Sequence, residues 1–227
     1  MEYREIERIF YRDGYRLAHQ HLGELIDATN LLEAIRRLYL SVDELLDAFL
    51  GRTAAEGRPA ECRKGCAWCC HQAVFAVTHE FLYLRQFVDR HTERSGQQRF
   101  AEMARAKSDH TMMKSLEGQL AFRFPCPFLY EGACSVYEAR PMACRIYLSS
   151  SASACCREYE NPGDDLHFPD LYEFPLRAGR MLNEGFVAYL KHSGLHTSEL
   201  PVEQGYISMV ENGLTMEEWI GERTSSP

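Results

Sequence analysis

Apolar residues recur at helical spacing along most of the chain. Between residues 31 and 49 they fall three or four positions apart, which places them on one face of an amphipathic helix that ends near Gly51. A weaker apolar stripe runs over residues 3–25, where Gly14 and Gly23 interrupt it. We expect these two helices to pack as a hairpin, followed by a linker over residues 51–61.

The middle of the chain alternates short extended segments with helices. An apolar run at 73–77 predicts an extended segment, and Thr78 is a suitable N-cap for a helix that continues to about His91. One or two helices are expected over 97–120, where Met112 and Met113 take apolar positions typical of a core.

The last third of the chain returns to helical periodicity. Residues 170–192 predict a helix that Pro175 kinks or restarts. Thr215 and Glu218 have the spacing of a capping box, which indicates a short final helix.

Cysteine spacing changes this picture from a plain helical protein to one with a chemical site. Four cysteines lie within one short loop, at Cys62, Cys66, Cys69 and Cys70. Soft thiolates this close together can converge on zinc or iron, whereas free thiols would oxidise readily. The other five come later in the chain, at Cys126, Cys134, Cys144, Cys155 and Cys156.

A disulfide framework is the alternative interpretation of the same cysteines. The N-terminal residues are charged and amphipathic and lack the features of a secretory signal, so we expect a cytoplasmic protein. Thiols stay reduced there, and nine cysteines leave one unpaired in any disulfide scheme. Metal binding is therefore the favoured interpretation.

Composition and charge exclude several partners. The chain of 227 residues is 45% hydrophobic and 26% charged, which is ordinary for a globular protein, and it has no apolar run long enough for a bilayer. A net charge of -8 argues against binding to the phosphate backbone of nucleic acids. Arg4, Arg8, Arg12 and Arg16 recur at helical spacing among acidic residues, as on a solvated helix face.

The second cysteine group lies among residues that favour loops. Prolines within 125–130 exclude a continuous helix, and Glu131-Gly132 predicts a turn that folds Cys134 back toward Cys126. Pro141 marks a helix entry one turn before Cys144. We expect Arg140 and Arg145 to offset the negative charge of a thiolate there.

Both cysteine groups together resemble the CxxCxxCC, or YkgJ-type, family. The likeness rests on the first four cysteines, the Pro125-Cys126-Pro127 segment, Gly132-Ala133-Cys134, Arg140-Pro141, Cys144-Arg145 and the late cysteine pair. Proteins of this family are described as zinc- or iron-chelating domains, so the resemblance implies the same for residues 62–156.

The predicted fold class is mainly α, with a helical domain around a cysteine-rich, loop-built metal core and little β structure. Within one globular unit we distinguish a helical N-terminal arm (1–58), the metal-binding core with inserted helices (59–160) and a helical C-terminal part (161–227). The predicted metal ligands are eight cysteines: Cys62, Cys66, Cys69, Cys70, Cys126, Cys134, Cys144 and Cys156. Cys155 can replace Cys156, and His71 is a further candidate, although a lone histidine beside such a cluster more often supports the ligands than joins them.

The cysteine count fits zinc or iron, including an iron-sulfur cluster, and nuclearity stays open because nine thiols exceed the four ligands of one tetrahedral ion. Three functions follow. The chain can be a cytosolic metal-binding protein, an iron-sulfur enzyme or electron carrier similar to flagellin lysine N-methylases, or a protein-interaction module stabilised by structural zinc. No recognised nucleotide-binding, serine hydrolase or zinc hydrolase motif selects an enzyme among them.

Overall fold

Helices account for most of the computed structural model, which describes residues 3–23, 25–63, 65–163 and 168–223. The strands within these ranges are two or three residues long and form two antiparallel pairs. The predicted fold class, mainly α with little β structure, is confirmed. No helix in the described part of the chain is long and apolar enough to cross a membrane.

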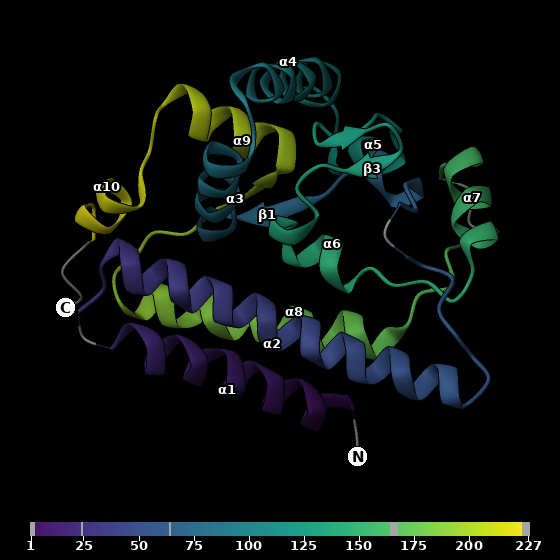
Figure 1. Ribbon diagram of the computed structural model, residues 1–227, viewed down its shortest axis with the longest axis horizontal. Helices are drawn as coiled ribbons and strands as arrows, with labels where there is room; N and C mark the ends of the chain where they lie inside the picture. The colour runs from purple at the N-terminus through teal and green to yellow at the C-terminus, as the bar shows by residue number, and fades with distance from the viewer. Residues whose placement is uncertain (1–2, 24, 64, 164–167, 224–227) are drawn as a thin grey trace.

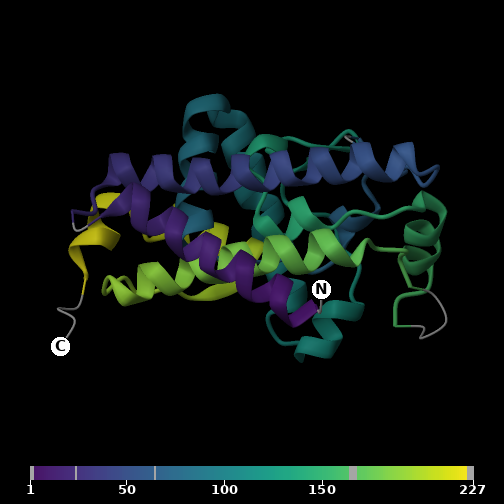
Figure 2. The same cartoon turned by 90° about the horizontal axis from the view of Figure 1, so that it is seen from below.

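Three long helices form one layer of the molecule: α1 (Tyr3–Leu22), α2 (Ala28–Ala55) and α8 (Glu173–His192). The three helices contact one another, and Figures 1 and 2 show α1 and α2 antiparallel, as the expected hairpin requires. Asp27 caps α2, because its carboxylate accepts a 2.8 Å hydrogen bond from the Asn30 backbone amide. The N-terminal arm, which forms α1 and α2, thus shares one layer with α8 of the C-terminal part.

Glycines set the distance between α1 and α8. A Cβ atom placed on Gly14 would lie 2.0 Å from the Leu182 carbonyl oxygen, and one on Gly185 would lie 1.9 Å from the Tyr11 carbonyl oxygen. Both contacts are with backbone, which cannot turn aside as a side chain can. The two glycines that weaken helix propensity thus allow the helices to pack at close range.

Helix α2 is longer than the sequence predicts. It continues past Gly51 to Ala55, so the expected linker over residues 51–61 is wrong in its first half. Gly51 is exposed and costs the helix only about 1 kcal/mol, while Arg52 pairs with Glu56 at 2.9 Å one turn later. The chain leaves the helix at Gly57, which has a φ of +75°.

A second layer covers α2 and α8 from the other side. Its elements are β1 (Phe75–Val77), α3 (Thr78–His91), α4 (Arg94–Thr111), β4 (Glu199–Pro201), α9 (Val202–Glu211) and α10 (Met216–Gly221). Strand β1 pairs antiparallel with β4 in the register Phe75 to Pro201, which joins residues far apart in sequence. The predicted capping box of Thr215 and Glu218 begins α10 and is confirmed.

Helix α3 begins one residue earlier than a Thr78 N-cap would place it. Val77 is the N-cap, and the Glu80 carboxylate accepts a 2.9 Å hydrogen bond from its backbone amide. Thr78 is the first helical residue, and its side chain forms hydrogen bonds with Ser198, the residue before strand β4. The predicted cap is wrong because a tertiary partner uses the hydroxyl group.

The predicted positions of Met112 and Met113 in the core are also wrong. Helix α4 ends at Thr111, so both methionines lie beyond its buried face and are 58% and 89% exposed. A separate short helix, α5 (Leu116–Ala121), follows after a turn.

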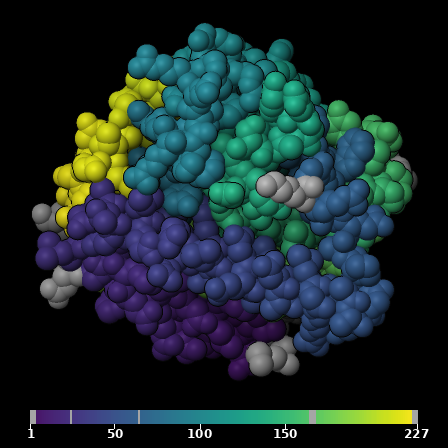
Figure 3. Space-filling model, viewed as in Figure 1, coloured from purple at the N-terminus to yellow at the C-terminus, as the bar shows by residue number. Residues whose placement is uncertain are grey.

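The cysteine-bearing segments occupy one end of the molecule. The regular elements of this region are η1 (Trp68–His71), β2 (Leu129–Tyr130), β3 (Ala133–Cys134), η2 (Tyr137–Ala139), α6 (Met142–Ile146) and α7 (Ala152–Glu160). The predicted turn joins β2 to β3, with positive φ values at Glu131 and Gly132. In the space-filling view the green surface of α7 lies on the side opposite the yellow C-terminal helices, with teal surface between them (Figure 3).

Replacing Gly185 with alanine is expected to destabilise the protein by about 1–3 kcal/mol, because the added methyl group forces α1 and α8 apart. Gly51→Ala is the matched control, since nothing lies within 4 Å of its added Cβ atom. That control should stabilise α2 by about 0.5–1 kcal/mol. Urea unfolding of both variants measures the two changes, and an equal effect of both would contradict the packing argument.

Candidate metal centre

Backbone hydrogen bonds bring the two cysteine groups of the sequence together. The Cys126 amide donates to the Cys70 carbonyl at 2.7 Å, and the Phe124 amide donates to the His71 carbonyl at 3.0 Å. The Cys62 amide donates to the Ser149 carbonyl at 3.3 Å. Segments that are 50 to almost 90 residues apart along the chain therefore lie against one another, because each satisfies polar backbone groups of the other.

Four cysteines surround a small cavity of about 10 Å³ between η1 and α7: Cys62, Cys66, Cys69 and Cys155. Burial raises the pKa of the Cys62 thiol, and the nearby Cys69, Cys66 and Cys155 raise it further. Burial likewise raises the pKa of Cys155, and the charges of Cys66 and Cys69 raise it further. We call these four residues the α7 group.

Four further cysteines lie toward the β2–β3 hairpin and α6: Cys70, Cys126, Cys134 and Cys144. Burial raises the pKa of Cys126 to about 11 and that of Cys144 well above its usual value, and the charges of neighbouring cysteines add to the shift at Cys144. Burial also raises the pKa of Cys134. We call these residues the hairpin group.

Cys69 connects the two groups. The Cys70 thiol forms a hydrogen bond with Cys69, which lowers the pKa of Cys69 and raises that of Cys70. Cys69 also raises the pKa of cysteines in both groups, Cys155 in one and Cys144 in the other. Within η1, Cys69 thus has neighbours in both groups, whereas Cys126 and Cys144 are the neighbours of Cys70 besides Cys69 itself.

Helix α7 turns one member of the late cysteine pair inward and the other outward. Gln72 donates a 2.6 Å hydrogen bond to Glu158, and Tyr159 packs its ring 4.9 Å from that of His71, so this face of α7 lies on η1. Cys155 shares that face and is buried. Cys156 lies about 100° further round the helix, where Glu160 and Arg157 are its charged neighbours.

Of the eight predicted ligands, the structure brings seven together and leaves Cys156 apart from them. It brings together Cys62, Cys66, Cys69, Cys70, Cys126, Cys134 and Cys144, and it adds Cys155 to them rather than Cys156. The imidazole of His71 contacts Tyr159, and its Nδ1 atom lies 3.1 Å from the Ala67 carbonyl oxygen. Its contacts are those of a residue that supports η1.

Arg140 takes the electrostatic role expected of it, whereas Arg145 does not. The positive charge of Arg140 lowers the pKa of Cys134 and Cys144 against the larger opposing effect of burial. The guanidinium of Arg145, which is 1% exposed, instead donates to Asp43 on α2 at 2.6 and 2.7 Å. The prediction that Arg145 offsets a thiolate is not supported by these contacts.

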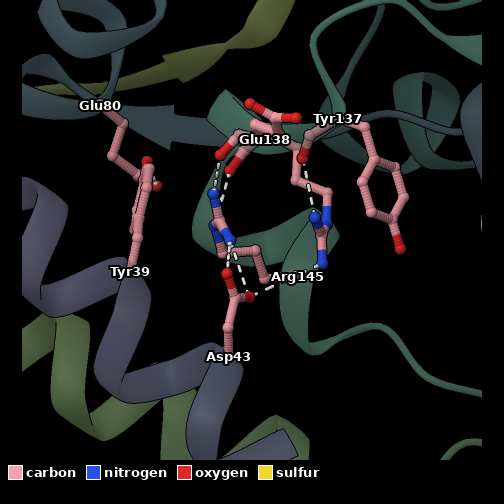
Figure 4. A network of polar contacts seen from close by, with 7 residues as sticks. Tyr39, Asp43, Glu80, Tyr137, Glu138 and Arg145 are labelled. Carbon is pink, nitrogen blue, oxygen red and sulfur yellow. Dashed lines mark hydrogen bonds and ion pairs between the residues drawn. The ribbon is translucent and has the colours of Figure 1, made fainter. Parts of the chain in front are cut away.

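Arg145 anchors the cysteine-bearing helix α6 to the long-helix layer (Figure 4). Besides Asp43, it donates to the carbonyls of Glu138 and Arg140, and it stacks 4.1 Å from the Tyr39 ring. Buried Glu80 holds the other end of α6 by accepting a 2.6 Å bond from the Met142 amide. Helix α6, with Cys144 at its centre, is thus fixed at both ends.

Sequence reasoning missed Glu80, Tyr39 and Asp43. Glu80 stands three residues after the N-cap of α3, a position where glutamate often bonds to the helix start, and this was an available signal. Asp43 and Tyr39 lie one turn apart on α2 and carried no comparable signal, because their partner Arg145 is about 100 residues away.

The donor set fits a thiophilic metal. Eight thiols in two groups of four match the four-sulfur shells that zinc and iron-sulfur clusters prefer. Within the described residues, no three Cys, His, Asp or Glu side chains are already arranged to hold an ion. Binding must therefore draw the sulfur atoms together and remove the protons that their raised pKa values retain.

Comparison with known proteins agrees with this chemistry. Residues 61–161 match the model of the CxxCxxCC family, a putative zinc- or iron-chelating domain. The match confirms the resemblance carried by the cysteine pattern and supports metal binding in general, and all nine cysteines fall within it. No curated protein and no solved structure matches the chain.

Replacing Arg145 with methionine (Arg145→Met) is expected to cost about 1–3 kcal/mol, because the Asp43 carboxylate and the carbonyls of Glu138 and Arg140 lose their donor. Arg37→Met is the control, since Arg37 forms an exposed 2.7 Å ion pair with Glu33 on the same helix as Asp43. The control should lose at most about 1 kcal/mol. Chemical denaturation distinguishes the two, and similar losses would show that Arg145 is no anchor.

Proposed function

We propose that this chain, whose residues 61–161 match a zinc- or iron-chelating domain, binds metal through two adjacent four-cysteine subsites. The observation that carries the proposal is the convergence of eight cysteines from distant segments at one end of the molecule. Free thiols in this arrangement would destabilise one another once ionised. A bound cation turns the same closeness into an attraction.

The α7 group and the hairpin group are the two proposed subsites. Each provides four sulfur ligands, so each can complete a tetrahedral shell without histidine or carboxylate. Cys69 and Cys70 belong to different subsites, which accounts for two adjacent cysteines in η1. Cys155 takes the place predicted for Cys156, because only Cys155 faces Cys66 and Cys69.

A single zinc ion in the α7 group is the form of the proposal that the geometry favours. Its cavity of about 10 Å³ is close to the space of one water molecule, which suits one ion better than a cluster of iron and sulfide. Zinc bound by four thiolates has no open position and acts by holding segments together. An iron-sulfur centre, the basis of the enzyme or electron-carrier alternative, would need a wider space.

The chain's own residues prepare the subsites in three ways. Arg140 offsets negative charge beside Cys134 and Cys144. The Ser149 hydroxyl forms a hydrogen bond with Cys155, which favours its thiolate against the opposing effect of burial. The α6 anchor holds Cys144 in place before any metal arrives. A bound metal would supply the remaining attraction between the segments.

Metal analysis and the visible spectrum of protein purified without oxygen or added metal test the proposal directly. We expect a colourless protein with about two equivalents of zinc, one for each subsite. A brown protein with iron and acid-labile sulfide would favour the iron-sulfur alternative. A protein with neither metal would contradict metal binding altogether.

Cys155→Ser and Cys156→Ser form a matched pair for the ligand assignment. We expect Cys155→Ser to lose about one equivalent of metal, because the α7 group keeps only three thiolates. Cys156→Ser should retain the full content, since its thiol faces Glu160 and Arg157. Loss from the second variant and not the first would reverse the assignment, and circular dichroism controls for folding.

A further inference from the structure

A buried pair of opposite charges lies behind the hairpin group. Lys107 on α4 is 3% exposed and Glu203 on α9 is 1% exposed, which is unusual for either residue type. The Lys107 ammonium lies 3.8 Å from Oε2 of Glu203 and donates a 3.1 Å hydrogen bond to the Gln72 carbonyl oxygen. The Thr111 hydroxyl lies 3.1 Å from Oε1 of Glu203.

The contacts of Lys107 and Glu203 compensate poorly for the cost of burying their charges. Two buried charges regain their lost hydration only when close contact and further hydrogen bonds compensate for it. Here the ammonium-to-carboxylate distance is long, and Oε2 of Glu203 has no hydrogen-bond partner. Well-packed apolar residues of similar volume often replace a buried ion pair without loss of stability, so the pair is not needed simply to hold α4 against α9. The position of Lys107 therefore calls for another explanation.

The surroundings of Lys107 provide that explanation. Its ammonium group donates to the Gln72 carbonyl two residues after Cys70, and the Cys70 carbonyl accepts from the Cys126 amide. Burial is the main cause of the raised pKa of Cys126, and the charge of Lys107 opposes this shift while that of Glu203 adds to it. The ammonium group thus lies where the two cysteine segments of the hairpin group meet.

We propose that Lys107 is the buried counter-charge of the hairpin subsite, and that Glu203 limits its effect. A divalent cation with four thiolates carries a net charge of -2, which is costly to bury without a compensating cation. Lys107 places a positive charge beside this anion in a medium of low dielectric constant, where its effect is largest. The inference rests on the proposed function and assigns Lys107 and Glu203 as positioning residues, not ligands.

The two residues are expected to change metal affinity in opposite directions. Glu203→Gln removes the opposing negative charge and should tighten zinc binding. The double variant Lys107→Met with Glu203→Gln leaves no charge stranded in the core, so it should fold, yet it lacks the counter-charge. We expect it to bind zinc on the order of 10- to 100-fold more weakly, as for other residues that support a metal shell.

A purely structural role for the pair predicts a different pattern. In that case Glu203→Gln would weaken binding by stranding Lys107, and the double variant would recover it. Lys107→Arg with native Glu203 should keep near-native affinity, because it preserves the charge. The matched control is Arg105→Met with Glu211→Gln, which removes an exposed 3.1 Å ion pair between the same two helices and should leave affinity unchanged.

Competition for Zn²⁺ against a chromophoric chelator measures the affinities, with thermal unfolding of each metal-free variant as the folding check. Opposite signs for Glu203→Gln and the double variant support the inference. Unchanged affinity in the double variant overturns it while leaving the proposed function intact. A native protein that binds neither zinc nor iron overturns the proposed function and the inference with it.

Discussion

The buried guanidinium of Arg145 is the contact on which the position of the cysteines depends. Helix α6 has five residues, too few to be stable alone, and Cys144 lies at its centre. Arg145 ties it to Asp43 on α2, while Glu80 on α3 accepts from its first amide. Both anchors belong to helices whose apolar faces are already buried in the core. The long helices thereby determine where a short, polar, cysteine-rich segment can lie.

This arrangement separates the source of stability from the source of chemistry. One hydrophobic core extends from α1 through α10 and includes both helical arms. The cysteine-bearing end has few regular elements and depends on hydrogen bonds such as that between Cys126 and Cys70. Phe128 and Met142 of this end also belong to the core, so the core holds the short segments that carry the thiols.

Local patterns predicted much of the fold, because the signals they rely on are local. The apolar periodicity of α2, the capping box at Thr215 and the turn at Glu131 each depend on residues within a few positions of one another. The choice between Cys155 and Cys156 depends instead on which face of α7 meets η1, and Arg145 depends on Asp43, about 100 residues away. Lys107 could have been noticed, since it follows Phe100 and Ala104 at the spacing of the buried face of α4.

The meeting of Cys62 with Cys155 also has a consequence for the entropy of the unfolded chain. An ion held by both residues would close a loop of nearly one hundred residues, as a cross-link does. For a disulfide closing a loop of that length, the chain-entropy model gives a stabilisation of between 4 and 5 kcal/mol, or about 4.7 kcal/mol for 100 residues. The ion would thus act as a reversible cross-link that a change in metal supply could add or remove, without a disulfide bond being formed or reduced.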